Sequence, residues 1–216
     1  MSLTYHQLRE RSLVRIAGLS DGVFAFAMTL IVFEVQVPDP GPISSEGQLA
    51  SALAALAPRF VTYLLSLLTL GIAWNAQQTF LQYVGTADRA FTWLQLAMLA
   101  VVTMYPFSTS LLAEFITFRL ALAVYWLNIV LFGITFFWGV AYASKARLLT
   151  DDAPRGLFAV IRRRVVVAQS LYAFGALLAV FSTYLSIAFI VLAQLYYALA
   201  LGPRIPLLRR TVIGRS

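Results

Sequence analysis

The sequence predicts an all-α membrane protein with six transmembrane helices in each subunit. Hydrophobic residues make up 61% of the chain and charged residues 12%, against about 45–50% and 25% in soluble domains. The mean hydropathy is +0.82, which leaves little polar surface for water. Six apolar segments approach or reach the length of about 20 residues that a bilayer core requires. Residues 1–216 are therefore expected to form a single six-helix transmembrane domain.

The expected spans follow one another with short connections. In order they cover Leu13–Val37, Pro58–Tyr83, Phe91–Leu112, Arg119–Ala143, Val165–Ser182 and Tyr184–Leu201. Prolines 38, 40 and 42 end the first helix because proline cannot continue a helical hydrogen-bond ladder. The Ala/Leu-rich segment Ser45–Leu56 is too short to span and is expected to form a short helix. Only a weak turn at Ser182–Ser186 separates the last two spans.

The basic residues predict the orientation of these spans. With six spans, 14 of the 16 Lys and Arg residues fall on one side, and only Arg59 and Arg119 fall on the other. Cytoplasmic segments carry such an excess, so both termini are expected in the cytoplasm. The net charge of +7 then reflects basic loops, and no nucleic-acid partner is expected. Contact of the loop 144–164 and the tail with anionic lipid headgroups is an alternative to simple positive-inside loops.

Enzyme signatures are missing from the sequence. The chain has no cysteine and a single histidine, His6, so disulfides, iron–sulfur clusters and thiolate chemistry are excluded. It contains no HExxH, no phosphate-cradling glycine loop and no Ser–His–Asp set. We therefore expect no enzyme activity, no cofactor and no metal site.

Three polar residues near the start of the first span carry the strongest functional signal: Arg15, Ser20 and Asp21. A charged side chain at the bilayer centre costs about 2.5–3.5 kcal/mol on insertion scales, so Asp21 needs a partner or water. Arg15 is six residues away and cannot pair with it along one helix. Residues of similar depth in the second span are candidate partners: Trp74, Asn75, Gln77 and Gln78. Interhelical packing contacts of modest energy are the alternative for these polar groups.

Large apolar residues form a stripe along the first span. At about 100° per residue, one arc about 80° wide holds Arg15, Leu19, Gly22, Phe26, Leu30, Phe33 and Val37. Thr29 lies at its edge, whereas Ser20 and Asp21 point elsewhere. Periodicity alone favours packing in a core or against lipid for this stripe. Glu34 and Glu114 lie near the outer ends of their spans, either as part of an acidic mouth or as solvated helix ends.

The first span resembles a known family. Arg15–Asp21 (RIAGLSD) is similar to the RxxxFSD signature of the transmembrane protein 175 potassium channels, and the likeness continues through GVFAFAMTLIVFEVQVP. Gly71–Trp74 (GIAW) resembles the family's tryptophan region, and Tyr105–Leu112 (YPFSTSLL) its PFxTxLL segment. Leu19 departs from the signature phenylalanine. Gln77 and Gln78 stand where family members often have histidines.

The resemblance implies a passive potassium-permeable channel of a bacterial inner membrane. It implies a homotetramer whose pore is lined by the first helix, at about residues 13–37. The family's constriction positions correspond to Phe26, Leu30 and Phe33, and Thr29 could add a hydroxyl layer beside them. Arg15, Ser20, Asp21 and Trp74 would form the network that holds this helix, and Glu34 would lie at the outer mouth. No TVGYG sequence is present, which excludes the usual carbonyl filter.

Two other functions stay open at the level of sequence. A proton leak pathway would need Asp21, Glu34 or a water wire to carry protons. A secondary transporter usually shows internal repeats and paired broken helices, and the second half of this chain shows no repeat of the RxxxLSD segment. Oligomeric mass would separate these classes, because a pore lined by the first helix requires several subunits.

Overall fold

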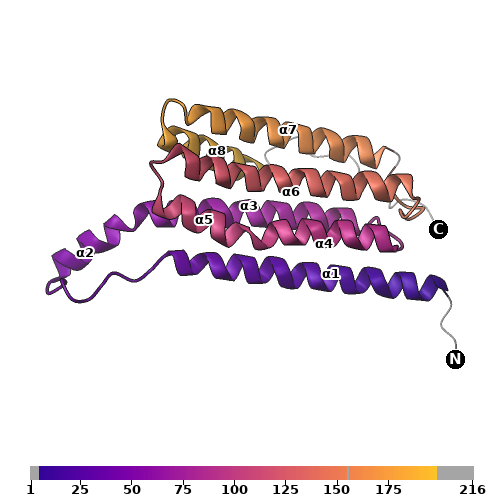
Figure 1. Cartoon of the computed structure of the whole chain (residues 1–216), viewed down its shortest axis with the longest axis horizontal. Coiled ribbons are helices and arrows are strands. Elements are labelled where there is room, and N and C mark those ends of the chain that lie inside the picture. Colours follow the sequence, from indigo (N-terminus) through magenta and orange to yellow (C-terminus); the bar gives the residue numbers. More distant parts are fainter. Residues whose placement is uncertain (1–4, 155, 199–216) are drawn as a thin grey trace, which may run out of the picture.

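The computed structural model describes residues 5–154 and 156–198, and all of its regular elements are helical apart from one isolated β-bridge. Most of the helices lie along one common direction (Figure 1). These are α1 (Tyr5–Leu30), α3 (Ala57–Leu81), α4 (Arg89–Thr103), α5 (Tyr105–Glu114), α6 (Arg119–Lys145), α7 (Leu157–Leu178) and α8 (Thr183–Ala198). The short α2 (Glu46–Ala55) projects beyond one end of the bundle. Ser45 begins α2 by accepting a hydrogen bond from the Gln48 backbone N–H.

Four helical segments are long and apolar enough to cross a membrane. They are Ser12–Glu34, Ala57–Leu81, Arg89–Glu114 and Arg119–Lys145, which correspond to the first four expected spans. The fifth and sixth expected spans, at α7 and α8, are not among these four segments. Helix α7 begins at Leu157, before the expected Val165, and so includes Arg162–Arg164. Helix α8 has 16 described residues. The expected end of the last span at Leu201, Arg155 and the tail arginines 204, 209, 210 and 215 lie outside the described residues.

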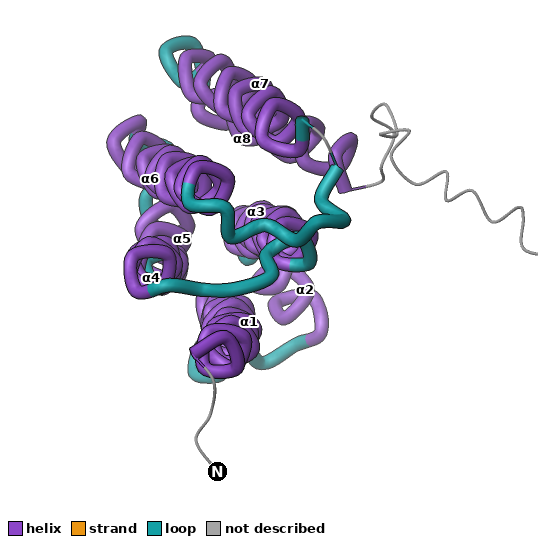
Figure 2. The backbone as a smooth tube through the Cα atoms, turned by 90° about the vertical axis from the view of Figure 1, so that its right-hand side faces the viewer, coloured by secondary structure: helices purple, strands orange, loops and turns teal. Residues whose placement is uncertain are grey.

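The bundle is layered, with α1 at one edge. Helix α1 packs against α3, α4 and α5, and α6 packs on the other side of α4 and α5. Helices α7 and α8 pair with each other beyond α6, with α8 also against α3 (Figure 2). Among the residues that the structure describes, one side of α1 is thus left without a neighbouring helix.

The first helix ends earlier than the sequence predicted. The α-helical pattern stops at Leu30, and a 3₁₀ turn, η1 (Ile31–Glu34), follows. The expected end at Val37 was wrong because Val35 leaves the helical conformation, with φ −89° and ψ 78°. Such 3₁₀ turns are common at the ends of α-helices.

The third span is also broken, into α4 and α5 at Met104. Pro106 lies in the first turn of α5, where its missing N–H is tolerated. Asn128 of α6 bridges the break: its carboxamide nitrogen donates to the Val101 carbonyl at 3.2 Å, and its oxygen accepts from the Tyr105 N–H at 3.2 Å. A side chain from α6 therefore satisfies backbone groups on both sides of the interruption.

A buried set of polar side chains, the hydroxyl cluster, joins the helices behind α1. It consists of Ser66 and Thr69 of α3, Thr109 of α5, Tyr125 of α6 and Gln194 of α8. The Tyr125 hydroxyl lies 3.2 Å from Ser66 Oγ and 3.0 Å from Thr69 Oγ1. Thr109 Oγ1 lies 2.7 Å from Ser66 Oγ, and Gln194 donates to Thr69 at 2.6 Å. Within a membrane, where lipid is as apolar as leucine, such contacts help to hold helices together.

Candidate ion-conducting surface on helix α1

Helix α1 presents two different faces. Its buried face packs Ile16, Ser20, Phe24, Ala27 and Ile31 against the bundle. The opposite face leaves Leu19, Phe26 and Phe33 exposed in the subunit, at 47%, 64% and 71%. Arg15, Gly22, Thr29 and Val37 are also exposed, and Leu30 is half-buried. The stripe recognised in the sequence therefore points out of the subunit, and the buried polar residue Ser20 points in.

Asp21 is attached to α3 by two side-chain donors. The Trp74 indole Nε1 donates to Asp21 Oδ1 at 2.9 Å, and the Gln78 amide donates to the same oxygen at 2.5 Å. Trp74 and Gln78 are four residues apart, so they share one face of α3. Asp21 and Trp74 are exposed, and Gln78 is half-buried.

Ser20 makes a second, buried attachment one residue earlier. The Gln77 amide nitrogen donates to Ser20 Oγ at 2.5 Å and to Gln95 Oε1 of α4 at 3.1 Å. Ser20 and Gln77 are fully buried and Gln95 is 2% exposed. Ser20 and Asp21 with Trp74, Gln77, Gln78 and Gln95 form one set of contacts between α1, α3 and α4, here called the α1 clasp.

Arg15 and Asn75 do not join the α1 clasp. Both are exposed, and neither side chain forms a hydrogen bond with the clasp residues. Arg15 lies on the outward face of α1, one turn before Leu19. Of the polar residues singled out in the first two spans, the structure thus brings Ser20, Asp21, Trp74, Gln77 and Gln78 together and leaves Arg15 apart.

The polar layer beside the stripe is provided by Thr29. Its hydroxyl donates to the Phe26 carbonyl at 2.8 Å, a bond within its own helix. The hydroxyl proton is therefore directed at the backbone, and the oxygen lone pairs remain available on the exposed side of α1. This arrangement suits contact with a cation more than with an anion.

The 3₁₀ turn changes the spacing of the stripe residues. Three residues of 3₁₀-helix rise by about 6 Å and bring side chains i and i+3 into line, whereas three α-helical residues rise by about 4.5 Å. Phe33 thus lies almost directly beyond Leu30. Phe26 precedes Leu30 by four α-helical residues, also about 6 Å. The three apolar levels are evenly spaced.

Arg59 of α3 contacts the C-terminal end of η1. Its guanidinium pairs with Glu114 of α5, with Nη2 to Oε2 at 2.6 Å, and donates to the Glu34 backbone carbonyl at 3.4 Å. The pair is open to solvent, since the Arg59 and Glu114 side chains are 28% and 59% exposed. Glu34 is half-buried, and Arg59 contacts its backbone, whereas Glu114 is ion-paired.

An apolar groove of about 500 Å³ runs along the outward face of α1 beside the α4–α5 break. Its walls include Leu19, Phe26 and Leu30 of α1 and Pro106 of α5. Gly18 and Gly22 open this surface further, since a Cβ added to either would meet no atom within 4 Å. Among the described residues, no group of three or more His, Asp or Glu side chains could hold a metal ion.

Sequence reasoning missed three parts of this site. Gln95 is the one amide side chain in α4, a signal that could have linked it to Gln77. The Arg59–Glu114 pair and the 3₁₀ turn carry no comparable signal, because both depend on how distant helix ends meet.

Comparison with known proteins places this site in a wider context. Residues 15–106, which run from the middle of α1 through η1, α2, α3 and α4 to the start of α5, match the family model described as endosomal/lysosomal potassium channel TMEM175. A potassium channel of Chamaesiphon minutus is 33% identical over 190 residues, covering 86% of this chain and 93% of that protein. A potassium channel of Streptomyces collinus is 38% identical over 127 residues, covering 56% and 60% of the two chains. The human endosomal/lysosomal proton channel TMEM175 is 36% identical over 97 residues, covering 43% of this chain and 19% of that one.

The fold is similar to a solved structure over nearly the whole described chain. The crystal structure of a lysosomal potassium-selective channel TMEM175 homolog from Chamaesiphon minutus superposes with a TM-score of 0.72 at 28% identity. The match covers 88% of this chain and 98% of that one.

Proposed function

Because the chain belongs to the TMEM175 family of potassium channels, we propose that it is a passive potassium-permeable channel of a bacterial inner membrane. In this proposal four subunits of six spans assemble with both termini in the cytoplasm. Four copies of α1 and η1 line the pore.

The outward stripe of α1 is the observation that carries this proposal. Helix α1 turns Ser20 and Asp21 toward α3 and leaves large apolar residues outside, where they can contact lipid or other subunits, and the family membership favours other subunits around a pore. The outward side of the exposed Phe26 and Phe33 and of the half-buried Leu30 faces no other helix in the described part of the chain. The groove beside Pro106 gives room there for a neighbouring subunit.

The proposed constriction consists of three apolar rings from Phe26, Leu30 and Phe33. Rings of this kind oppose ion passage by expelling water, because a hydrated cation cannot shed its water onto hydrocarbon cheaply. The resemblance implied aliphatic rings, whereas two of these positions are aromatic. The exposed oxygens of four Thr29 side chains would supply a partial substitute for lost water. Glu34 would add negative charge at the outer mouth.

The α1 clasp has a positioning role in this proposal. Ser20 and Asp21 lie on the sides of α1 that contact α3, away from the centre of the stripe, so they orient the helix and do not coordinate the permeant ion. Arg15 lies on the stripe at the inner membrane edge, where a long side chain can reach the headgroups.

Ion flux into liposomes tests the proposal. Purified protein should dissipate K⁺ gradients faster than Na⁺ gradients and should have the mass of four subunits. Phe26→Ser and Leu30→Ser should wet the constriction, raising flux and lowering the K⁺/Na⁺ ratio. The matched controls are Phe174→Ser and Leu127→Ser, exposed residues on α7 and α6. Equal flux in wild-type, Phe26→Ser and Leu30→Ser tetramers would remove α1 from the pore.

Proton permeation is the second candidate function, favoured by the exposed carboxylate of Asp21 and by the proton-channel names of the vertebrate relatives. Proton flux without added K⁺, abolished in Asp21→Asn, would support it. Proton flux below one tenth of K⁺ flux at matched gradients would exclude it as the main activity.

A further inference from the structure

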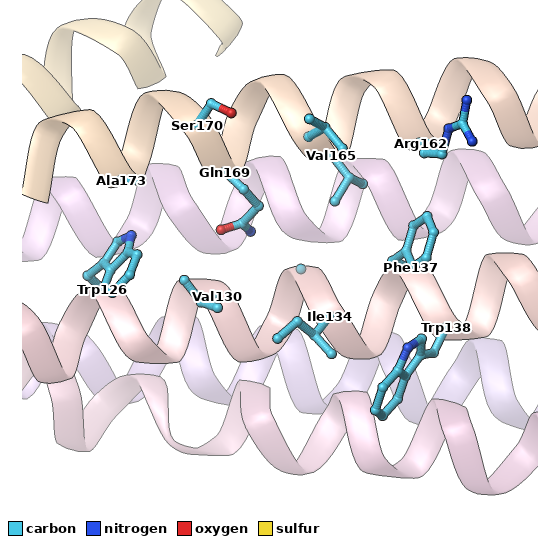
Figure 3. Close-up of a pocket in the computed structure, with 12 residues that line it drawn as sticks. Trp126, Val130, Ile134, Phe137, Trp138, Arg162, Val165, Gln169, Ser170 and Ala173 are labelled. Atoms are coloured by element: carbon cyan, nitrogen blue, oxygen red, sulfur yellow. The ribbon is translucent and has the colours of Figure 1, made fainter.

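A second groove lies on the opposite side of the subunit from α1, between α6 and α7. It has a volume of about 550 Å³ and is mostly apolar. Trp126 and Ala173 lie at one end, and Trp138 and Arg162 lie at the other (Figure 3). The groove is thus separate from the proposed pore surface.

The floor of the groove is shaped by a glycine and a glutamine. A Cβ at Gly133 of α6 would lie about 2.1 Å from the Gln169 amide nitrogen, so only glycine leaves room for that side chain. Gln169 extends from α7 toward α6 (Figure 3) and donates to the Ile129 carbonyl at 3.1 Å. This hydrogen bond joins α7 to α6 at the floor of the groove.

The length of the groove matches one leaflet of a bilayer. Trp126 and Trp138 are 12 residues apart on α6, which corresponds to about 18 Å of helix. Half of a hydrocarbon core measures about 15 Å. A single extended acyl chain lying along α6 is therefore long enough to fill the groove.

Three arginines at the Trp138 end of the groove make this end positively charged, which favours an anionic ligand. Arg162, Arg163 and Arg164 are consecutive exposed residues of α7, in a helix whose following residues are apolar. Within the described part of the chain, no carboxylate forms an ion pair with any of them. Arginine in a membrane segment is costly unless it reaches the headgroups or finds an anion. Of the three, only Arg162 lines the groove.

We infer that this groove binds one acidic phospholipid of the cytoplasmic leaflet. Its phosphate would pair with Arg162, and one acyl chain would lie between α6 and α7 toward Trp126. Arginine suits this partner because its planar guanidinium forms bidentate hydrogen bonds with phosphate. The amphipathic ring of Trp138 suits the boundary between headgroup and chain.

Lipid binding by the purified wild-type protein, titrated in native mass spectrometry, tests this inference. Phosphatidylglycerol should bind its tightest site more strongly than phosphatidylcholine. Arg162→Gln should weaken phosphatidylglycerol binding about fivefold and leave phosphatidylcholine unchanged. Arg163→Gln, which removes the same charge outside the groove, should change phosphatidylglycerol binding by less than about twofold. Equal losses in the two variants would indicate diffuse charge attraction and would overturn the inference.

A second pair of variants tests separately whether an acyl chain occupies the groove. Ser170→Phe fills the groove and should weaken both lipids, whereas Val167→Phe changes an exposed residue of α7 outside the groove and should weaken neither. If Ser170→Phe binds both lipids like wild type, no chain lies there. Glycerol 3-phosphate, which has the anion without the chain, should not compete at equal concentration. Competition at equal concentration would make this an anion site and would also overturn the inference.

Discussion

The α1 clasp and the hydroxyl cluster both join helices through polar side chains, but they differ in burial. Every member of the hydroxyl cluster is buried, and Tyr125 is fully so. The α1 clasp is divided: Ser20, Gln77 and Gln95 are buried, Gln78 is half-buried, and Asp21 and Trp74 are exposed. The cluster joins α3, α5, α6 and α8. The clasp joins the edge helix α1 to α3, and α3 to α4.

The difference in burial suggests different roles: the hydroxyl cluster stabilises the subunit, whereas the α1 clasp sets the orientation of α1. Breaking a fully buried polar contact leaves unsatisfied groups in a low-dielectric interior, at about 1–3 kcal/mol each. Breaking a contact at the surface costs less, because water or headgroups replace the lost partner. We therefore expect mutations in the hydroxyl cluster to lower subunit stability, and mutations in the α1 clasp to alter the orientation of α1 and hence assembly or flux.

The largest effect on stability is expected from Tyr125→Phe. Loss of the hydroxyl removes the shared partner of Ser66 and Thr69, and we expect unfolding to be easier by about 1–2 kcal/mol. Thermal unfolding in detergent measures this. Tyr184→Phe, at an exposed tyrosine of α8, should have no effect. An unchanged Tyr125→Phe protein would show that the cluster is not a stabilising scaffold.

A smaller loss is expected from Gln77→Leu in the buried half of the clasp. Ser20 and Gln95 would lose their common donor, but the change also removes Gln77 Oε1, which has no partner among the described residues. These effects oppose each other, so we expect about 0.5–1 kcal/mol. Gln82→Leu, at the exposed C-cap of α3, is the control. A loss larger than that of Tyr125→Phe would reverse the ranking of the two regions.

Asp21→Asn should change subunit stability by less than about 0.5 kcal/mol and yet change the assembly. The asparagine oxygen still accepts a hydrogen bond from Trp74 or Gln78, but the charge is lost. We expect less stable tetramers or lower flux with an unchanged K⁺/Na⁺ ratio, measured by mass in detergent and by liposome flux. Asp39→Asn in the exposed connection before α2 should match wild type. A stable Asp21→Asn tetramer that has lost its K⁺ preference would make Asp21 a permeation site.

A small, salt-dependent effect is expected from Arg59→Gln at the C-terminal end of η1. Exposed ion pairs contribute about 0–1 kcal/mol and are screened by salt. The loss should be visible at low ionic strength and shrink at high ionic strength in thermal unfolding. Arg119→Gln is the matched control, because Arg119 donates to the Val180 carbonyl at 2.8 Å and no carboxylate is involved. The same salt dependence in both variants would argue against a specific Arg59–Glu114 contribution.

The sequence predicted contacts best where one helix has a strong pattern. The 100° period along α1 placed Phe26, Leu30 and Phe33 away from Ser20. Because a carboxylate in a membrane is costly, Asp21 was expected to have a hydrogen-bond partner, and Trp74 was among the candidates. Their roles in conduction stay predictions. The expected membership of the TMEM175 channels, and with it the absence of enzyme function, is confirmed by the relative that matches 86% of the chain.

The hydroxyl cluster was not predicted, because it depends on contacts between residues far apart in the sequence. Ser66, Thr69 and Thr109 give no local signal, because Ser and Thr in a helix can satisfy their hydroxyls on their own backbone. Thr69 and Thr109 also do so here, at 2.7 and 2.8 Å. The six-span count was hardest at α7, where the arginines that predicted a cytoplasmic loop lie inside the helix.

The bridge made by Asn128 has a consequence for the order of events during biosynthesis. The Val101 carbonyl already accepts from the Met104 N–H at 3.1 Å within the third span, but the Tyr105 N–H emerges from the ribosome before its partner Asn128. An unsatisfied backbone group costs several kcal/mol in hydrocarbon, so the third span alone enters the bilayer with one backbone donor unpaired. Only when α6 follows, across the short connection after Glu114, is this N–H satisfied. The smallest self-sufficient unit for membrane insertion is thus the hairpin of α4, α5 and α6, and we expect these segments to leave the translocon together.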